Sequence, residues 1–118
     1  DIWIKTIQEL QPDLIVLAGF MRILDGKFLS TFKNKIINLH PSLLPSFPGL
    51  NSIEQAFEKK VKITGCTVHW VNEKIDSGKI IEQASCPVWE DDNEHTLHAR
   101  IHELEHKIYA DAIKQIMR

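Results

Sequence analysis

The chain has 118 residues, of which 43% are hydrophobic and 25% are charged, and its formal net charge at pH 7 is −2. This length suits one globular domain that buries roughly two-thirds of its unfolded surface. The weak charge excludes the basic surface of a nucleic-acid or anionic-membrane binder, and no apolar run approaches the ~20 residues of a transmembrane helix.

The first third of the chain predicts helices that alternate with buried strands. Ile2 to Gln11 has helical apolar spacing and is stopped by Pro12, and Leu14 to Ala18 is a continuous apolar run typical of a parallel strand. Asp25 to Phe32 predicts a short helix, and Ile36 to Leu39 predicts a second strand. A right-handed crossover then brings the two strands together as a βαβ unit.

The middle of the chain predicts a loop, a helix and an antiparallel pair of strands. Pro41 to Leu50 contains three prolines, and Asn51 is expected to cap a helix from Ser52 to Lys60. Lys62 to Val71 and Lys79 to Val88 are rich in β-branched residues and are separated by a polar turn that ends in glycine. The overall prediction is therefore an α/β fold with a mostly parallel sheet, an antiparallel extension and helices on both faces.

The last predicted helix opens at Asp92 or Asn93 and runs to about Met117. Its apolar stripe recurs at three- and four-residue steps and consists of Leu97, Ile101, Leu104, Ile108 and Ala112. A row of imidazoles has similar spacing and consists of His95, His98, His102 and His106. Such a row could bind a divalent metal, but most helical histidine rows are solvated faces, so we expect no metal site.

The two cysteines, Cys66 and Cys86, match neither a zinc spacing nor a redox-pair spacing. Both lie in strand-like segments. We therefore expect buried free thiols and a cytoplasmic location.

The pair Asn38 and His40 is the strongest candidate for chemistry. The two residues are two apart at the end of a predicted strand, so both side chains project from one face at the carboxyl end, where open α/β sheets bind ligands. Pro41 ends the strand because it lacks an N–H group. Taken alone, an Asn-x-His pair more often satisfies local backbone groups than it performs catalysis.

The surrounding residues change this balance. The stretch from Asn38 to Leu50, NLHPSLLPSFPGL, resembles the signature of the folate-dependent formyltransferases, in particular those that act on glycinamide ribonucleotide. Further segments agree with this family in order and spacing, and they are Asp13 to Leu24, Gly65 to His69, Asp76 to Ile81, and Glu105 to Tyr109. The resemblance extends from about Pro12 to Tyr109, which is most of the chain.

The resemblance implies a catalytic trio of Asn38, His40 and Asp76. An amide donor would stabilise the oxyanion of a tetrahedral intermediate, and an imidazole beside a carboxylate would move the proton. No activated nucleophile is visible, so we expect direct attack by the substrate amine. The implied folate contacts are Met21, Arg22, Ile23, Leu24, Asn38, Asn72, Glu73, Lys74, Ile75 and Asp76. The implied glycinamide ribonucleotide contacts are Pro41, His102, Glu103, Leu104 and Glu105, with His102 in place of the family's usual glutamine.

The implied activity is transfer of a formyl group from 10-formyltetrahydrofolate, as cosubstrate, to glycinamide ribonucleotide in purine synthesis. The expected partners are small molecules, with no metal, nucleic acid or membrane. A homodimer is a further possible assembly. Methionyl-tRNA formyltransferases usually differ from Phe47 to Leu50, and deformylases usually have a second histidine at Pro41. Another folate-dependent transferase or a non-catalytic folate-binding module also remains open.

Members of the resembled family open with a strand and a glycine-rich phosphate-binding turn. No such turn is visible here, and Asp1 begins directly before a helical pattern. We therefore expect residues 1–118 to be the C-terminal, folate-binding and catalytic part of a single formyltransferase domain. The N-terminal strands would be missing, and this part alone should have little activity.

Overall fold

The computed structural model describes residues 2–18, 26–72 and 78–117. The elements in chain order are α1 (Ile2–Leu10), β1 (Ile15–Ala18), α2 (Gly26–Thr31), β2 (Ile36–His40), α3 (Ser52–Glu58), β3 (Ile63–Trp70), β4 (Ile80–Pro87) and α4 (Glu94–Ile116). These elements confirm the predicted order, and their ends differ from the predicted ends by a few residues at most. Of the helices in these ranges, none combines the length and apolarity needed to cross a membrane.

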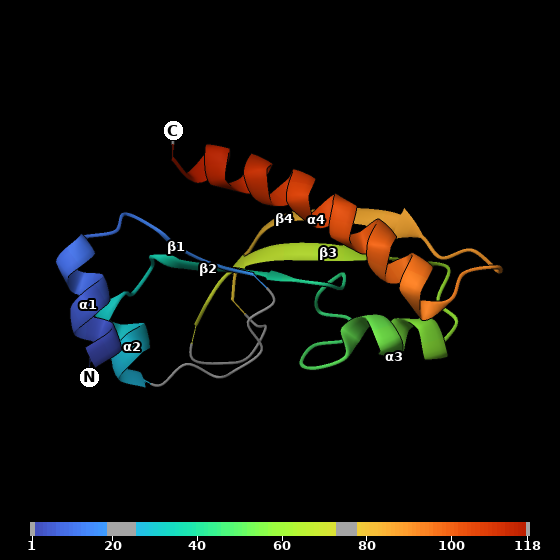
Figure 1. Ribbon diagram of the computed structural model, residues 1–118, viewed down its shortest axis with the longest axis horizontal. Coiled ribbons are helices and arrows are strands. Elements are labelled where there is room, and N and C mark those ends of the chain that lie inside the picture. The colour runs from blue at the N-terminus through green and yellow to red at the C-terminus, as the bar shows by residue number, and fades with distance from the viewer. Residues whose placement is uncertain (1, 19–25, 73–77, 118) are drawn as a thin grey trace.

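The four strands form one mixed sheet in the order β1-β2-β3-β4 (Figure 1). β1 and β2 are parallel, with Ile15 opposite Ile36, as expected for a βαβ unit. β2 pairs with β3, and β3 with β4, in antiparallel orientation. The α/β class and the antiparallel extension are thus confirmed, and among the described strands the parallel part is the β1–β2 pair.

Helix α4 covers one face of the sheet and forms the larger core there (Figure 1). The predicted apolar stripe of α4 is confirmed, since four of its residues are buried and Leu104 is half-buried against them. The sheet residues that meet this helix alternate along their strands and are Ile37, Leu39, Cys66 and Val68. This alternation leaves the other face of β2 and β3 to different side chains.

The opposite face of the sheet is covered near β1 by α1 and α2. Ile4 of α1, Phe32 after α2, and Ile36 of β2 form a second, smaller buried cluster. Ile36 and Ile37 are neighbours in sequence but belong to different clusters, because successive strand residues point to opposite faces. Helices therefore lie on both faces, as predicted.

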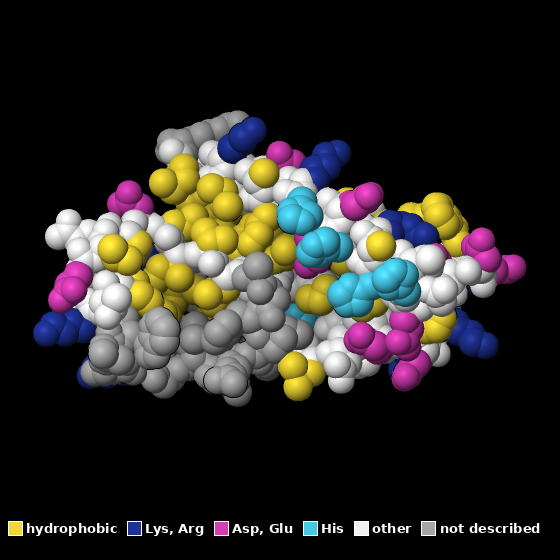
Figure 2. Space-filling model, viewed as in Figure 1, with side chains coloured by type: hydrophobic (Ala, Val, Ile, Leu, Met, Phe, Trp, Pro, Cys, Tyr) yellow, Lys and Arg dark blue, Asp and Glu magenta, His cyan; other side chains and the backbone are white. Residues whose placement is uncertain are grey.

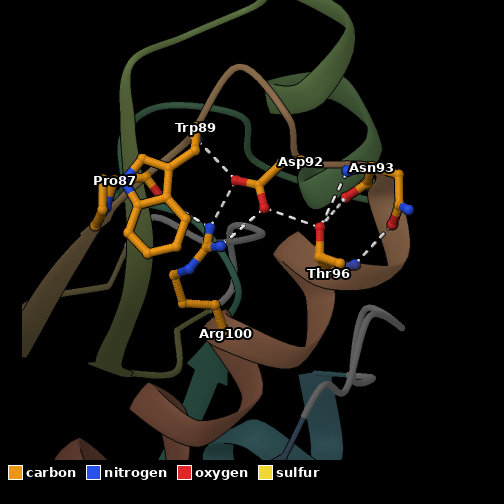
Figure 3. A network of polar contacts seen from close by, with 6 residues as sticks. All are labelled: Pro87, Trp89, Asp92, Asn93, Thr96 and Arg100. Atoms are coloured by element: carbon orange, nitrogen blue, oxygen red, sulfur yellow. Dashed lines mark hydrogen bonds and ion pairs between the residues drawn. The ribbon is translucent and has the colours of Figure 1, made fainter.

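The start of α4 is fixed by the polar network shown in Figure 3. Asn93 is the N-cap, and its side chain accepts a hydrogen bond from Thr96 N at 2.8 Å while Thr96 Oγ1 accepts one from Asn93 N. Asp92 instead receives two hydrogen bonds from Arg100, at 2.7 and 2.8 Å, and the Arg100 guanidinium lies 4.0 Å from the centre of the Trp89 ring. Of the two predicted caps, Asn93 is thus the one that caps.

The prediction that the Asn51 side chain caps α3 is wrong. Asn51 does occupy the N-cap position, but its backbone is left-handed, with φ of 59°, and its side chain makes no capping hydrogen bond. Helix capping by Asn requires an extended backbone at that residue, which aims the side chain at the helix N–H groups. The Gln55 side chain instead donates to Leu50 O at 2.7 Å.

Candidate active site

Four buried polar side chains lie together on the sheet face that α4 does not cover. Asn38 and His40 project from β2, and their partners in the strand pairing are His69 and Thr67 of β3. Their exposed fractions are 3% for Asn38, 0% for His40, 2% for His69 and 0% for Thr67. The alternate residues on the same strands form the apolar core, so β2 and β3 each have one polar face and one apolar face. The predicted pairing of Asn38 and His40 on one face is what the strand geometry produces.

The ring of His40 is held through its Nε2 atom. Nε2 lies 2.9 Å from the carbonyl oxygen of Phe47 and 2.9 Å from the hydroxyl oxygen of Ser52. A carbonyl oxygen can only accept a hydrogen bond, so Nε2 must be the nitrogen that carries the proton. In neutral His40 the second nitrogen, Nδ1, is therefore the one with a lone pair, and a proton gained by the ring is gained there.

The loop after β2 adopts an unusual backbone to reach His40. Phe47, Gly49 and Asn51 all have positive φ, at 49°, 83° and 59°. This region costs an ordinary residue about 1–2 kcal/mol, and it is uncommon for a bulky one such as Phe47. The conformation aims the Phe47 carbonyl oxygen at three donors, which are His40 Nε2, Ser42 Oγ at 3.3 Å and Ser52 Oγ at 2.8 Å. Strain of this kind is often found at functional sites.

The same loop is attached to β3 and β4 by two side chains. Thr67 Oγ1 donates to Ser42 O at 2.7 Å and accepts from Leu44 N at 3.1 Å. Gln83 Nε2 donates to Leu44 O at 2.9 Å and to Thr67 Oγ1 at 3.0 Å. The loop is thus fixed on both sides, by Ser52 and His40 on one and by Thr67 and Gln83 on the other.

A cavity of about 460 Å³ lies between the end of β2, the start of α3 and α4. Its volume falls within the range of ~300–1,000 Å³ that is usual for small-molecule sites. The lining residues include Pro41, Ser52, His98, His102, Glu105 and His106. Figure 2 shows histidine side chains gathered in a row on the face that carries α4. The described part of the chain holds no group of three or more His, Cys, Asp and Glu residues arranged to bind a metal.

The carboxyl and imidazole groups of this cavity lie close together along α4. Glu105 is half-buried, and burial raises the pKa of its carboxyl, while the neighbouring His102 acts in the opposite direction. His102 Nδ1 lies 3.4 Å from Glu105 Oε1, and His102 Nε2 lies 3.3 Å from His106 Nε2. A carboxylate among imidazoles suits a substrate that presents an amine and several hydroxyl groups.

The structure brings together some of the predicted site residues and separates others. Pro41, His102 and Glu105 line the same cavity, whereas Glu103 is exposed and Leu104 packs against the core below α4. Asn72 is exposed just after β3. The remaining predicted folate and catalytic residues lie outside the described residues, and they are Met21, Arg22, Ile23, Leu24, Glu73, Lys74, Ile75 and Asp76.

Gly78 stands directly after the undescribed part that contains Asp76. A Cβ atom added at Gly78 would lie 1.6 Å from the carbonyl oxygen of Trp70, so the two backbones approach more closely than any side chain permits. Position 78 therefore requires glycine.

Sequence reasoning missed Ser52, Thr67 and Gln83 as parts of the site. In β3, polar Thr67 and His69 alternate with apolar Cys66 and Val68, and this period of two was the signal that could have placed Thr67 and His69 beside Asn38 and His40. Cys66 itself is inert, because burial raises the pKa of its thiol to about 12.

Comparison with known proteins gives one consistent result. The sequence profile of the formyl transferase family matches residues 2–113. The chain is 46% identical over 114 residues to phosphoribosylglycinamide formyltransferase from Bacillus subtilis, covering 97% of this chain and 58% of that protein. It is 48% identical over 110 residues to the human trifunctional purine biosynthetic protein adenosine-3, covering 93% of this chain and 11% of that protein.

Solved structures agree with the sequence comparisons. The phosphoribosylglycinamide formyltransferase of Bacillus halodurans superposes with a TM-score of 0.94 at 41% identity, covering 98% of this chain and 59% of that one. The enzyme of the same name from Anaplasma phagocytophilum gives a TM-score of 0.91 at 49% identity, with coverage of 95% and 54%. The chain therefore spans little more than half the length of these single-function relatives.

Proposed function

We propose, because this chain belongs to the formyl transferase family, that the intact protein transfers a formyl group from 10-formyltetrahydrofolate to the amine of glycinamide ribonucleotide in purine synthesis. The observation that carries this proposal is the buried pair Asn38 and His40 at the end of β2. His40 is linked to the cavity under α4 through Ser52, which lies 2.9 Å from its ring and lines that cavity. The names of the relatives, phosphoribosylglycinamide formyltransferase among them, support the choice of substrate.

The proposed reaction is a direct transfer between two nitrogens. The amine nitrogen of the acceptor attacks the formyl carbon, and a tetrahedral centre with a negative oxygen forms. The Asn38 amide donates to this oxygen, and an oxyanion donor of this kind typically contributes about 10²–10³ in rate. The bond from the carbon to the folate nitrogen then breaks, and the proton lost by the amine goes to that nitrogen.

His40 is proposed to move this proton through Nδ1, since Nε2 is held by Phe47 and Ser52. The sequence resemblance adds Asp76 as the carboxylate that supports the imidazolium form. It also assigns folate contacts to Met21–Leu24, Asn38 and Asn72–Asp76.

The acceptor is proposed to bind in the cavity, where Pro41, His102 and Glu105 are the predicted contacts. Glu103 and Leu104 were predicted as further contacts of the acceptor. Glu103 is exposed and Leu104 packs against the core, so the proposal assigns the side-chain contacts to the other three residues. The buried free thiols of Cys66 and Cys86 support the proposed cytoplasmic location.

The test is a turnover assay of the intact protein with 10-formyltetrahydrofolate and three acceptors, which are glycinamide ribonucleotide, water and methionyl-tRNA. Glycinamide ribonucleotide should be formylated with a kcat/KM at least about 10³ times that of either alternative, because it is a small molecule that presents an amine, whereas water has no amine and methionyl-tRNA is a macromolecule. Formate release without an acceptor would identify a deformylase, and binding of folate without any product would identify a non-catalytic module.

A further inference from the structure

We infer that Ser52 is a positioning residue for this reaction: together with the Phe47 carbonyl it holds the His40 ring in the orientation in which Nε2 carries the proton and Nδ1 is the nitrogen that takes part in proton transfer. The inference rests on the proposed function, because it takes His40 as the group that moves the proton. It assigns a role to a residue for which sequence analysis found none.

The three groups form a closed, buried arrangement. Ser52 Oγ is 2.9 Å from His40 Nε2, 2.8 Å from Phe47 O and 3.2 Å from Gly49 O. His40 is 0% exposed and Ser52 is 1% exposed, so bulk water does not compete for these hydrogen bonds. The Ser52 hydroxyl has one proton, which it gives to a backbone carbonyl, and its lone pairs remain to accept the proton of Nε2.

This arrangement fixes which way the ring faces. The last torsion of a histidine side chain is two-fold and broad, so the ring can flip unless its nitrogens are held. A flipped ring would place a carbon where Nε2 now donates, so Ser52 Oγ would lose the donor of the ring and Phe47 O would keep only the serine hydroxyls as donors, in a buried site. Such losses cost about 1–3 kcal/mol for each buried group, which favours the observed orientation.

Ser52 matters because the other acceptor is carried by a strained residue. Phe47 has φ of 49°, and its carbonyl points at His40 only while that conformation persists. The Ser52 hydroxyl donates to the same carbonyl and contacts the ring, so it links the first turn of α3, the loop and His40. Without it, the ring is held by one acceptor instead of two.

The test compares Ser52→Ala and Ser52→Thr with Ser42→Ala in the intact protein. Ser42 is a matched control because its buried hydroxyl also bonds to Phe47 O, at 3.3 Å, and to Ser46 O, at 2.5 Å, but has no hydrogen bond to the His40 ring. We expect Ser52→Ala to lower kcat about tenfold, as for the loss of one buried hydrogen bond, with KM for both substrates changed by less than about threefold. Ser52→Thr should recover most of the lost rate, and Ser42→Ala should lower kcat less than Ser52→Ala does.

A spectroscopic readout separates positioning from general support of the fold. In the wild type, the ring nitrogens of His40 should show a protonated Nε2 with slow proton exchange in ¹⁵N-resolved NMR, and Ser52→Ala should speed this exchange at least about tenfold for the same reason. If Ser52→Ala unfolds, Ser52→Cys replaces it, since a thiol is nearly as small but a weak hydrogen-bond partner.

Unchanged kcat in Ser52→Ala, or equal losses in Ser52→Ala and Ser42→Ala with unchanged ring exchange, would overturn the inference and leave formyl transfer intact. By contrast, full turnover in His40→Ala would refute the acid–base role of His40 in the proposed function. The ring-exchange measurement does not depend on turnover, so the two failures are distinguishable.

Discussion

Two polar networks of this chain differ in their place in the fold and in their expected roles. Around His40, a ring nitrogen and a serine hydroxyl meet a backbone carbonyl, deep in the fold and next to a cavity. Around Arg100, a guanidinium meets the Asp92 carboxylate and the Pro87 carbonyl, at the surface end of α4 and against an exposed Trp89. The first network rests on left-handed backbone, and the second completes a regular helix start.

The difference indicates which features distinguish a network that serves a reaction from a network that stabilises the fold. Short polar contacts occur in both places, but only the His40 network combines full burial, a strained loop and a hydroxyl, that of Ser52, which lines a cavity of substrate size. The Arg100 network joins the end of β4 to the first turns of α4, so its expected contribution is to folding. Mutations in the two networks should therefore change different quantities.

The largest expected effect is on turnover, in the His40 network. His40→Ala and Asn38→Ala in the intact protein should each lower kcat by about 10² or more, because under the proposed mechanism one removes the proton carrier and the other the oxyanion donor. Steady-state kinetics measure this, and thermal unfolding controls for stability. Arg100→Ala is the matched variant from the other network and should keep kcat within about twofold while it lowers the unfolding midpoint. Near-wild-type turnover in His40→Ala would remove the basis of the comparison.

The next effect concerns Gly78, whose backbone lies against Trp70 of β3. Gly78→Ala should destabilise the fold by about 1–3 kcal/mol or more, since its Cβ would collide with the Trp70 carbonyl oxygen, and it should lower kcat as well. Denaturant unfolding and kinetics test both. Gly26→Ala is the control, because a Cβ there meets nothing within 4 Å and alanine favours the helix. Equal stability of the two variants would contradict the close approach.

A smaller effect is expected at the N-cap of α4. Asn93→Ala removes the side-chain acceptor of Thr96 N and should lower the free energy of unfolding by about 1 kcal/mol. Turnover of the folded protein should stay unchanged, because the cap lies in the network that supports folding. Chemical denaturation gives the first value and initial rates give the second. A loss of kcat without a loss of stability would show that the α4 start takes part in the reaction.

The smallest effect depends on pH. The hydrogen bonds from Arg100 hold the pKa of the Asp92 carboxyl well below its usual range. A group whose pKa is lowered by folding stabilises the fold above its unfolded pKa of ~3.9, and this contribution is lost as the pH falls through the folded value.

The unfolding midpoints of wild type and Asp92→Asn should consequently differ by a constant amount above about pH 5, and the difference should shrink as the solution becomes more acidic. Asp91→Asn controls for the removed charge. A difference that grows with acidity would mean that the ion pair is not what stabilises this region.

Much of the fold could be predicted from local patterns. The apolar runs at residues 14–18 and 36–39 and the stripe on α4 gave correct elements, because burial on one or both faces leaves a clear period in the sequence. Asn51 was misjudged as a capping side chain, since residue type does not reveal that its φ is positive. Asn at a helix start favours both conformations, and the loop geometry decides between them.

The site was less predictable, because its hydrogen bonds join distant residues. Ser52 is 12 residues from His40, Thr67 is 25 from Ser42, and Gln83 is 39 from Leu44. No spacing rule relates such pairs, and only strand register brings Thr67 opposite His40. The pair Asn38 and His40 was visible because its two members belong to one strand.

The longest of these links is the hydroxyl of Tyr109, which donates to the backbone carbonyl of Leu17, 92 residues earlier, and lies 3.3 Å from Ile37 O. Tyr109 also lines the cavity. The contact of Tyr109 with Leu17 joins the second half of α4 to β1, so its two ends are far apart in sequence. Forming it has a large entropic cost of loop closure, and we expect it to form late in folding. During synthesis, the β1–β2 pair must wait for α4 to emerge before this contact exists. A ribosome-bound chain that ends before Tyr109 would thus contain His40 but lack the wall of the cavity to which Tyr109 belongs.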